Sequence, residues 1–204
     1  MSLDRKEIAK ILLKCEAIKL NLKNKFVWSS GILSPIYCDN RVILSYPNAR
    51  EALVEALAEK ITECFADVEA IVGVATAGIA KGALLAQNLS IPYAYCRTEP
   101  KEHGTKKQLE GRLNPGSKVV VFEDLISTGG SSLKVVQYLR DAGFIVLGVQ
   151  AIFTYGTKKA EENFSTHTSL ETIVDVQSLM DVAILEKHIT QEQAKEVLDF
   201  LHTL

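Results

Sequence analysis

The sequence predicts an α/β fold in which helices flank a central, mostly parallel sheet. Short apolar runs alternate with segments whose apolar residues have helical spacing, which is the pattern of successive βαβ units. The run at 118–124 (KVVVFED) is nearly continuous, as in strands covered on both faces. The chain has 204 residues, 47% of them apolar and 24% charged. We therefore expect one domain over 1–204, with a core large enough to need no disulfides.

The first part of the chain predicts two helices separated by extended segments. Between Asp4 and Leu22, apolar side chains recur mostly at helical spacing. Turn residues then divide 26–41 (FVWSSGILSPIYCDNR) into two short extended pieces. A second helix is predicted from Pro47 to about Phe65, because proline is well placed in a first helical turn.

The rest of the chain alternates strands with helices. Strands are predicted at 70–74, 91–96, from 118 and at 144–155, and helices at 77–89 and about 131–142. A weaker strand follows at 171–176. The last helix starts at Thr190, where TQEQ resembles a capping box.

Composition argues against several classes of protein. Lys and Arg total 23 and Asp and Glu total 25, a formal charge of −2, so neither nucleic acid nor an anionic membrane is expected as a partner. No segment approaches the roughly 18 apolar residues of a membrane span, and the N-terminal segment lacks a signal-peptide core. The four cysteines form no C-x-x-C pair, which argues against structural zinc and fits a reducing compartment. We expect a cytoplasmic protein.

The polar segment 97–116 is long for a connection inside a compact domain. It holds three glycines, two prolines, five basic and three acidic residues, in a chain that is acidic overall. Such a segment can be merely solvated, but its length and local charge favour a lid or binding loop.

The segment 119–132 (VVVFEDLISTGGSS) carries the strongest functional signal. A buried strand runs into Glu123 and Asp124, and a Ser/Thr/Gly turn then opens into a helix. Backbone N–H groups at such a turn can hold a phosphate, and the glycines allow close approach. Because bare carboxylates repel phosphate, the two acids are better suited to sugar hydroxyls or a hydrated cation. Together these features predict a ribose 5-phosphate site. The sequence has no nucleoside-triphosphatase, dinucleotide or nucleophile-elbow motif.

These residues resemble a known family. VVVFEDLISTGGSS is similar to the phosphoribosyl-pyrophosphate (PRPP) signature of type I phosphoribosyltransferases. Three further segments resemble orotate phosphoribosyltransferases in the same order, over nearly the whole chain. They are the base-binding hood FVWSSGILSPIYCDNR, the pyrophosphate-side loop GVATAGIAKG and the catalytic loop RTEPKEHGTKKQLEGRLNPG.

The resemblance implies an activity and an assembly. The enzyme would join orotate to PRPP with Mg²⁺, giving orotidine 5′-monophosphate and pyrophosphate in pyrimidine biosynthesis. It would have a hood over about 1–45 and a mobile catalytic loop over about 97–116. That loop would reach the neighbouring subunit of a homodimer.

Roles for single residues follow from the same resemblance. Catalytic residues would be Lys101, His103 and Asp124. The PRPP-binding set would be Thr76, Ala77, Arg97, Lys101, His103, Glu123, Asp124, Ser127, Thr128, Gly129, Gly130 and Ser131. Mg²⁺ would be held mainly through PRPP, near Glu123 and Asp124. Lys101 and His103 could instead be solvated loop residues, and 75–78 could serve only strand-to-helix packing.

For orotate, the resemblance implies Ser34, Tyr37, Asp39, Arg41, Ser127 and Tyr155. Arg41 is a natural cation for the orotate carboxylate, but it could equally pair with Asp39. Phe26 and Trp28 are expected to pack within the hood. The chain also departs from some members of the family, which carry Lys at the positions of Ser29, Ala77 and Thr98 and Arg at that of Tyr155.

Three alternative functions stay open at this point. The chain could use another nucleobase with the same signature. It could be a regulator that binds nucleic acid, or a phosphoribosyl-binding protein without catalysis.

Overall fold

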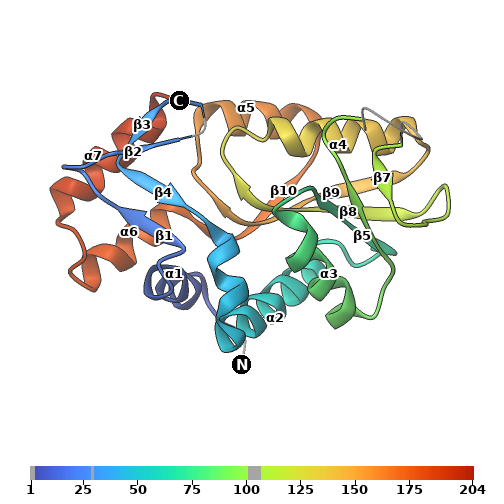
Figure 1. The fold of residues 1–204 in the computed structure, drawn as a ribbon, viewed down its shortest axis with the longest axis horizontal. Helices are drawn as coiled ribbons and strands as arrows, with labels where there is room; N and C mark the ends of the chain where they lie inside the picture. Colours follow the sequence, from blue (N-terminus) through green and yellow to red (C-terminus); the bar gives the residue numbers. More distant parts are fainter. Residues whose placement is uncertain (1–2, 29, 101–106) are drawn as a thin grey trace.

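A computed structural model describes residues 3–28, 30–100 and 107–204. Within them, one six-stranded sheet has the order β10-β9-β8-β5-β6-β7 (Figure 1). All its pairings are parallel except that of the edge strand β7 with β6. The strands are β5 (Ala70–Val74), β6 (Tyr93–Cys96), β7 (Leu109–Glu110), β8 (Lys118–Ile126), β9 (Ile145–Thr154) and β10 (Leu170–Asp175). The predicted fold class is confirmed.

Helices cover both faces of this sheet (Figure 1). Because successive strand residues point to opposite faces, the core divides in two. Val120 and Phe122 pack into the cluster under α2 and α3, whereas Val119 and Val121 pack under α4 and α5. The helices are α1 (Arg5–Lys14), α2 (Pro47–Cys64), α3 (Gly78–Leu89), α4 (Gly130–Asp141), α5 (Lys158–His167), α6 (Val176–Leu185) and α7 (Gln191–His202).

The sequence located most of these elements correctly. The strands at 70–74, 91–96 and 144–155 and the helices at 47–65 and 77–89 agree with the structure to within about two residues. The predicted capping box of the last helix is also present. The Thr190 side chain accepts a hydrogen bond from the Gln193 backbone, and the Gln193 side chain accepts one from the Thr190 backbone.

The helix predicted over 4–22 is too long and is corrected here. It ends at Lys14, and Glu16 takes a left-handed conformation with φ of 54°. The chain then forms β1 (Ile18–Leu20), antiparallel to β4 (Ile36–Cys38). Apolar residues at 18, 20 and 22 have the two-residue period of a strand, and this local period outweighs the helical one.

The hood segment and the C-terminal part also differ from prediction. The two extended pieces expected over 26–41 are three strands, β2 (Phe26–Val27), β3 (Leu33–Ser34) and β4, with β2 paired to β3. Helices α5 and α6 were not predicted, because α5 is rich in charge and buries few side chains, while α6 follows β10 without a turn residue. The loop at 97–116 contains β7, which extends the sheet.

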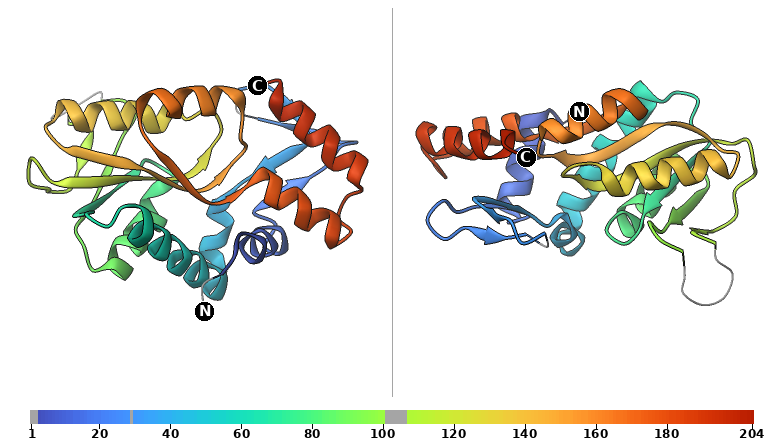
Figure 2. Two further views of the ribbon diagram at one scale, coloured as in Figure 1. Left: turned by 180° about the vertical axis from the view of Figure 1, so that it is seen from behind. Right: turned by 90° about the horizontal axis from the view of Figure 1, so that it is seen from above.

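The hood strands lie at the same end of the molecule as α6 and α7 (Figures 1 and 2). The 3-10 helix η1 (Asn40–Ser45) connects them to α2. Trp28 joins hood and C-terminal helix through an edge contact with Phe200, with ring centroids 6.3 Å apart. No helix in the described part of the chain is both long enough and apolar enough to cross a bilayer.

Candidate functional site

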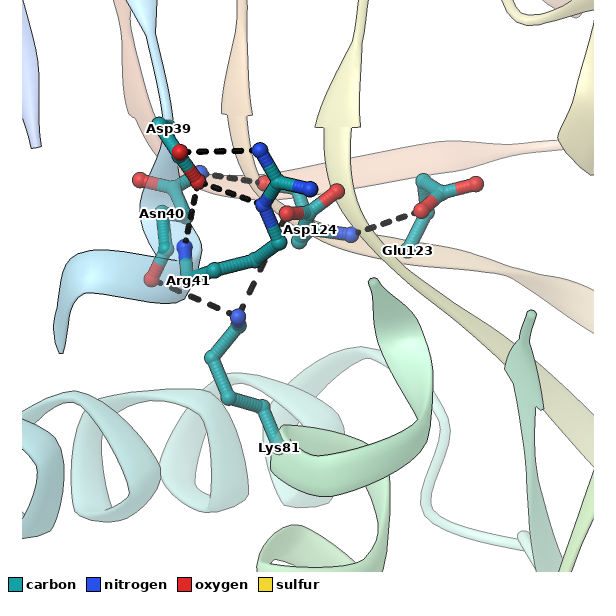
Figure 3. Close-up of polar contacts among 6 residues, drawn as sticks. All are labelled: Asp39, Asn40, Arg41, Lys81, Glu123 and Asp124. Atoms are coloured by element: carbon teal, nitrogen blue, oxygen red, sulfur yellow. Dashed lines mark hydrogen bonds and ion pairs between the residues drawn. The ribbon is translucent and has the colours of Figure 1, made fainter. Parts of the chain in front are cut away.

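The carboxyl end of β8 carries two buried acids that point to opposite faces of the sheet. Glu123 lies on the α4 side, where its Oε2 accepts a hydrogen bond from the Ser132 hydroxyl at 3.5 Å. Asp124 lies on the α3 side, where its Oδ2 is 4.0 Å from the Lys81 ammonium (Figure 3). This arrangement follows from the alternation of side chains along a strand.

Burial sets the electrostatics of the two acids. It raises the pKa of Glu123 well above its ordinary value, and the neighbouring Asp124 raises it further. Burial also raises the pKa of Asp124, while the positive charge of Lys81 opposes that rise. Acids in such a site are suited to accept hydrogen bonds from neutral hydroxyl groups, because a second anion beside them would be repelled.

The turn after β8 leaves the start of α4 open. Gly129 has φ of 80°, a conformation that favours glycine, and α4 begins at Gly130 without a side-chain cap on its first N–H groups. A Cβ on Gly129 would lie 2.4 Å from Cε2 of Phe164. The uncapped N–H groups and the positive end of the helix dipole favour an anion at this turn.

Helix α5 fixes the backbone of this turn. The Thr157 hydroxyl donates to the Ser127 carbonyl at 2.7 Å, and the Asn163 amide donates to the Thr128 carbonyl at 2.8 Å. Both carbonyls are therefore held toward α5. These two hydrogen bonds restrain the shape of the turn, and a restrained turn lowers the ordering cost of binding.

A second open turn follows β5, the neighbour of β8 in the sheet. Ala75, Thr76 and Ala77 lead into α3, whose N-cap Ala77 provides no side-chain cap. Parallel pairing of Gly73 with Phe122 brings this turn to the same edge as the β8 turn. Thr76 is exposed and Ala77 half-buried. Two uncapped helix starts thus flank the acidic pair.

A cavity of about 660 Å³ extends from the β8 turn to the hood. Trp28 and Tyr155 stack on its wall, with ring centroids 4.8 Å apart and ring planes inclined by 18°. Two cations, Arg41 and Lys159, also line it, as do Tyr37, Cys38, Leu125, Ser127, Thr128 and the hood residues Ser30 and Ile32. A planar, anionic ligand fits this combination of aromatic and cationic walls.

The structure separates the predicted orotate residues into two groups. Tyr37, Arg41, Ser127 and Tyr155 line the cavity. Ser34 instead is fully buried, and its hydroxyl donates to the Ile36 carbonyl at 2.8 Å.

Asp39 is the partner of Arg41. Nε and Nη2 of Arg41 donate to the two Asp39 carboxylate oxygens at 2.7 and 2.8 Å. This hydrogen bonding lowers the pKa of Asp39. The pairing expected as an alternative role for Arg41 is therefore present, and Arg41 is also one of the residues that line the cavity.

The predicted catalytic loop, 97–116, begins directly after β6 and contains β7. Nε of Arg97 lies 3.7 Å from Oε1 of Glu110, and the Gln108 side chain donates to the Arg97 carbonyl at 2.9 Å. Lys101 and His103 lie outside the described residues, as does Ser29. The base of the loop lies at the carboxyl end of β6, two strands from β8.

Sequence reasoning missed Lys81, Asn40 and Lys159. Lys81 could have been found, because it falls on the stripe of α3 that faces the sheet, together with Gly78, Gly82 and Leu85. Asn40 and Lys159 give no such signal, since their importance depends on contacts between distant segments.

The two acids could contribute to a Mg²⁺ site but could not form one alone. No group of three or more His, Cys, Asp or Glu side chains suited to a metal is present in the described ranges. Mg²⁺ prefers six oxygen ligands and is commonly held by one or two carboxylates together with substrate phosphates and water. Glu123 and Asp124 fit an ion that arrives mainly on its substrate.

Comparison with known proteins agrees with this geometry. Residues 43–182 match a family model described as a phosphoribosyl transferase domain. The orotate phosphoribosyltransferase of Staphylococcus saprophyticus is 48% identical over 200 residues, covering 98% of both chains.

Solved structures are similar as well. The orotate phosphoribosyltransferase of Aeropyrum pernix superposes with a TM-score of 0.75 and 33% identity, over 85% of this chain and 96% of that one. The Mycobacterium tuberculosis enzyme in complex with PRPP has the same fold, with a TM-score of 0.67 and 20% identity over 87% of this chain and 99% of that one.

Proposed function

The chain belongs to the orotate phosphoribosyltransferase family, and from that membership we propose how its residues carry out the reaction. It transfers the phosphoribosyl group of PRPP to orotate, giving orotidine 5′-monophosphate and pyrophosphate. The bond between C1′ and the pyrophosphate oxygen breaks, a bond from C1′ to a ring nitrogen of orotate forms, and the proton lost from that nitrogen is released with the pyrophosphate. The observation that carries this function is the acidic pair between two uncapped helix starts, with a cationic and aromatic cavity beside it.

The β8 turn would bind the 5′-phosphate of PRPP. Its open N–H groups and the N-terminus of α4 stabilise a doubly charged group, and Thr128 and Ser131 add hydroxyl donors. Asp124 and Glu123 would accept hydrogen bonds from the ribose hydroxyls. The sugar is then fixed from both ends, so that C1′ faces the cavity.

The 75–78 turn and the catalytic loop would take the pyrophosphate. The transition state resembles a ribosyl cation separating from a polyanion, so catalysis depends on stabilising the departing charge. Backbone groups at Thr76 and Ala77 suit this, because small side chains leave the backbone accessible. Lys101 and His103 would add a positive charge and a proton or hydrogen bond.

Orotate would occupy the cavity under the hood. The ring would lie against the Trp28–Tyr155 pair, and its carboxylate would meet Arg41 or Lys159. Arg41 is already paired with Asp39, whereas Lys159 forms no ion pair with another described residue. Lys159 is therefore the better candidate. Lys159 supplies a cation to a chain that has Ser29 and Tyr155 at positions where some members of the family carry Lys and Arg.

Mg²⁺ is the implied cofactor. When bound to PRPP it would neutralise pyrophosphate charge and so stabilise the leaving group. Glu123 and Asp124 would lie near the ion while binding the ribose.

We also propose a homodimer whose catalytic loops are exchanged. The base of the loop lies at the sheet edge, away from β8, which is consistent with a loop that serves a neighbouring site. Cytoplasmic location is proposed as well, and the four unpaired cysteines support it.

The function is tested by following orotate absorbance after adding PRPP and Mg²⁺. We expect orotate to be consumed only when both are present, and chelation of Mg²⁺ should abolish the reaction. Adenine, hypoxanthine and uracil serve as controls and should not react. Consumption of one of them in place of orotate would contradict the proposed base specificity while leaving phosphoribosyl transfer intact.

Lys159→Met should weaken orotate recognition. We expect the KM for orotate to rise about three- to tenfold with little change in the KM for PRPP, because one exposed cation is lost. Lys158→Met is the matched control, since Lys158 is adjacent and exposed but does not line the cavity. If both substitutions raise the KM for orotate equally, the effect comes from the net charge of this surface and not from a contact of Lys159 with orotate.

The exchanged loop predicts complementation between inactive variants. Lys101→Ala and Asp124→Asn should each be nearly inactive as homodimers. After mixing and subunit exchange, about a quarter of wild-type activity should return, because half the dimers are mixed and each holds one intact site. Absence of any recovery, with exchange verified by mass, would mean that the loop serves its own subunit.

A further inference from the structure

Lys81 is a buried cation that the reaction described above leaves without a role. Its side chain is only 2% exposed, among the lowest values for any large side chain of the described chain. It projects from α3, on the stripe of residues that pack against the sheet. A lysine on such a stripe costs stability unless its charge is compensated, since apolar residues normally occupy these positions.

Two oxygens compensate this charge, and both belong to the site. Nζ of Lys81 lies 4.0 Å from Oδ2 of Asp124 and 3.4 Å from the Asn40 carbonyl oxygen (Figure 3). Asn40 in turn donates through its side-chain amide to the Asp124 carbonyl at 2.7 Å. The three residues come from α3, η1 and β8. Lys81 therefore contacts Asp124, the acid proposed to bind the ribose, at the point where the hood joins the sheet.

The packing of α3 makes this approach possible. A Cβ on Gly78 would lie 2.8 Å from the Phe122 carbonyl oxygen, and one on Gly82 would lie 3.3 Å from the Phe122 ring. Glycines at these two positions let the helix sit close to β8. The lysine side chain then reaches the end of the strand without leaving the interior.

The charges around Asp124 explain why a cation is needed there. Asp124 is buried, and the nearby Asp39 repels its negative charge. Among the charges around it, Lys81 favours the ionised carboxylate most, ahead of Arg41. Arg41 is committed to Asp39. No other lysine or arginine of the described chain forms an ion pair with Asp124.

We propose that Lys81 is a positioning residue for PRPP binding, which pairs with the Asp124 carboxylate from within the protein and holds it oriented toward the ribose hydroxyls. The inference rests on the proposed function, because it assigns Asp124 to the ribose. Lys81 itself touches no substrate in this account. Lys81 contacts Asp124 from the face of the sheet that α3 covers, while the ligand binds at the carboxyl end of the strand.

The alternative role for Lys81 is to anchor the hood through its hydrogen bond to the Asn40 carbonyl. Lys81→Gln separates the two roles, because the amide can still donate to the Asn40 carbonyl but carries no charge. Lys81→Met removes both the charge and the donor. Lys60→Met is the matched control, since Lys60 lies on α2 and pairs with Glu63 and Glu171 away from the site.

The decisive experiment is a double-mutant cycle on Mg²⁺–PRPP affinity, measured by calorimetry without orotate. Lys81→Gln and Lys81→Met should each weaken binding roughly ten- to a hundredfold. This is the loss expected when one or two hydrogen bonds from the ribose hydroxyls to the charged Asp124 carboxylate are lost. In an Asp124→Asn background, the same substitutions should change affinity less than about threefold, since the charge they serve is already absent. Lys60→Met should bind as the wild type does.

Several results would overturn the proposal. Wild-type affinity in Lys81→Gln would assign Lys81 to anchoring the hood, and so would equal losses with and without Asp124. If Lys81→Met does not fold, two other variants still test the proposal. They are Lys81→Gln alone and Lys81→Met combined with Asp124→Asn, which removes both buried charges together. If the wild-type protein binds PRPP but does not consume orotate, the proposed base specificity is wrong. The double-mutant cycle on PRPP affinity then still tests the role of Lys81. Wild-type protein that binds no PRPP would overturn both.

Discussion

Two adjacent acids are buried at the end of one strand, and much of the site can be understood from that constraint. The alternation of β8 sends Glu123 toward α4 and Asp124 toward α3. Each acid then meets a different partner, a serine hydroxyl on one face and a lysine ammonium on the other. Separation onto two faces lets both acids occupy one strand end without sharing a partner.

The same strand end is also where the anion-binding turns meet. Parallel pairing of β5 with β8 brings two uncapped helix starts to one edge, and each of them favours an anion. Helix α5 fixes one turn through Thr157 and Asn163. The turn after β8 is thus shaped by contacts that lie outside the signature motif.

The sequence predicted the strand–turn–helix unit well because all its determinants are local. An apolar run, two acids and a glycine turn are read from neighbouring residues, and Gly129 adopts the conformation that the motif requires. The partners of this unit were harder to predict. Asn40 reaches Asp124 across 84 positions and Lys81 reaches Asn40 across 41, so their contacts exist only in the folded chain. Helix α5 was missed because its charged sequence has little apolar periodicity, although it anchors the turn.

The central claim is that the phosphoribosyl group binds at the carboxyl end of β8, and a crystal structure with ribose 5-phosphate tests it most directly. This ligand carries the sugar hydroxyls and the 5′-phosphate but no pyrophosphate. The account predicts the phosphate within hydrogen-bond distance of the backbone N–H groups of 128–131, with the hydroxyls on Asp124. A phosphate bound at the 75–78 turn, or hydroxyls turned away from Asp124, would contradict it.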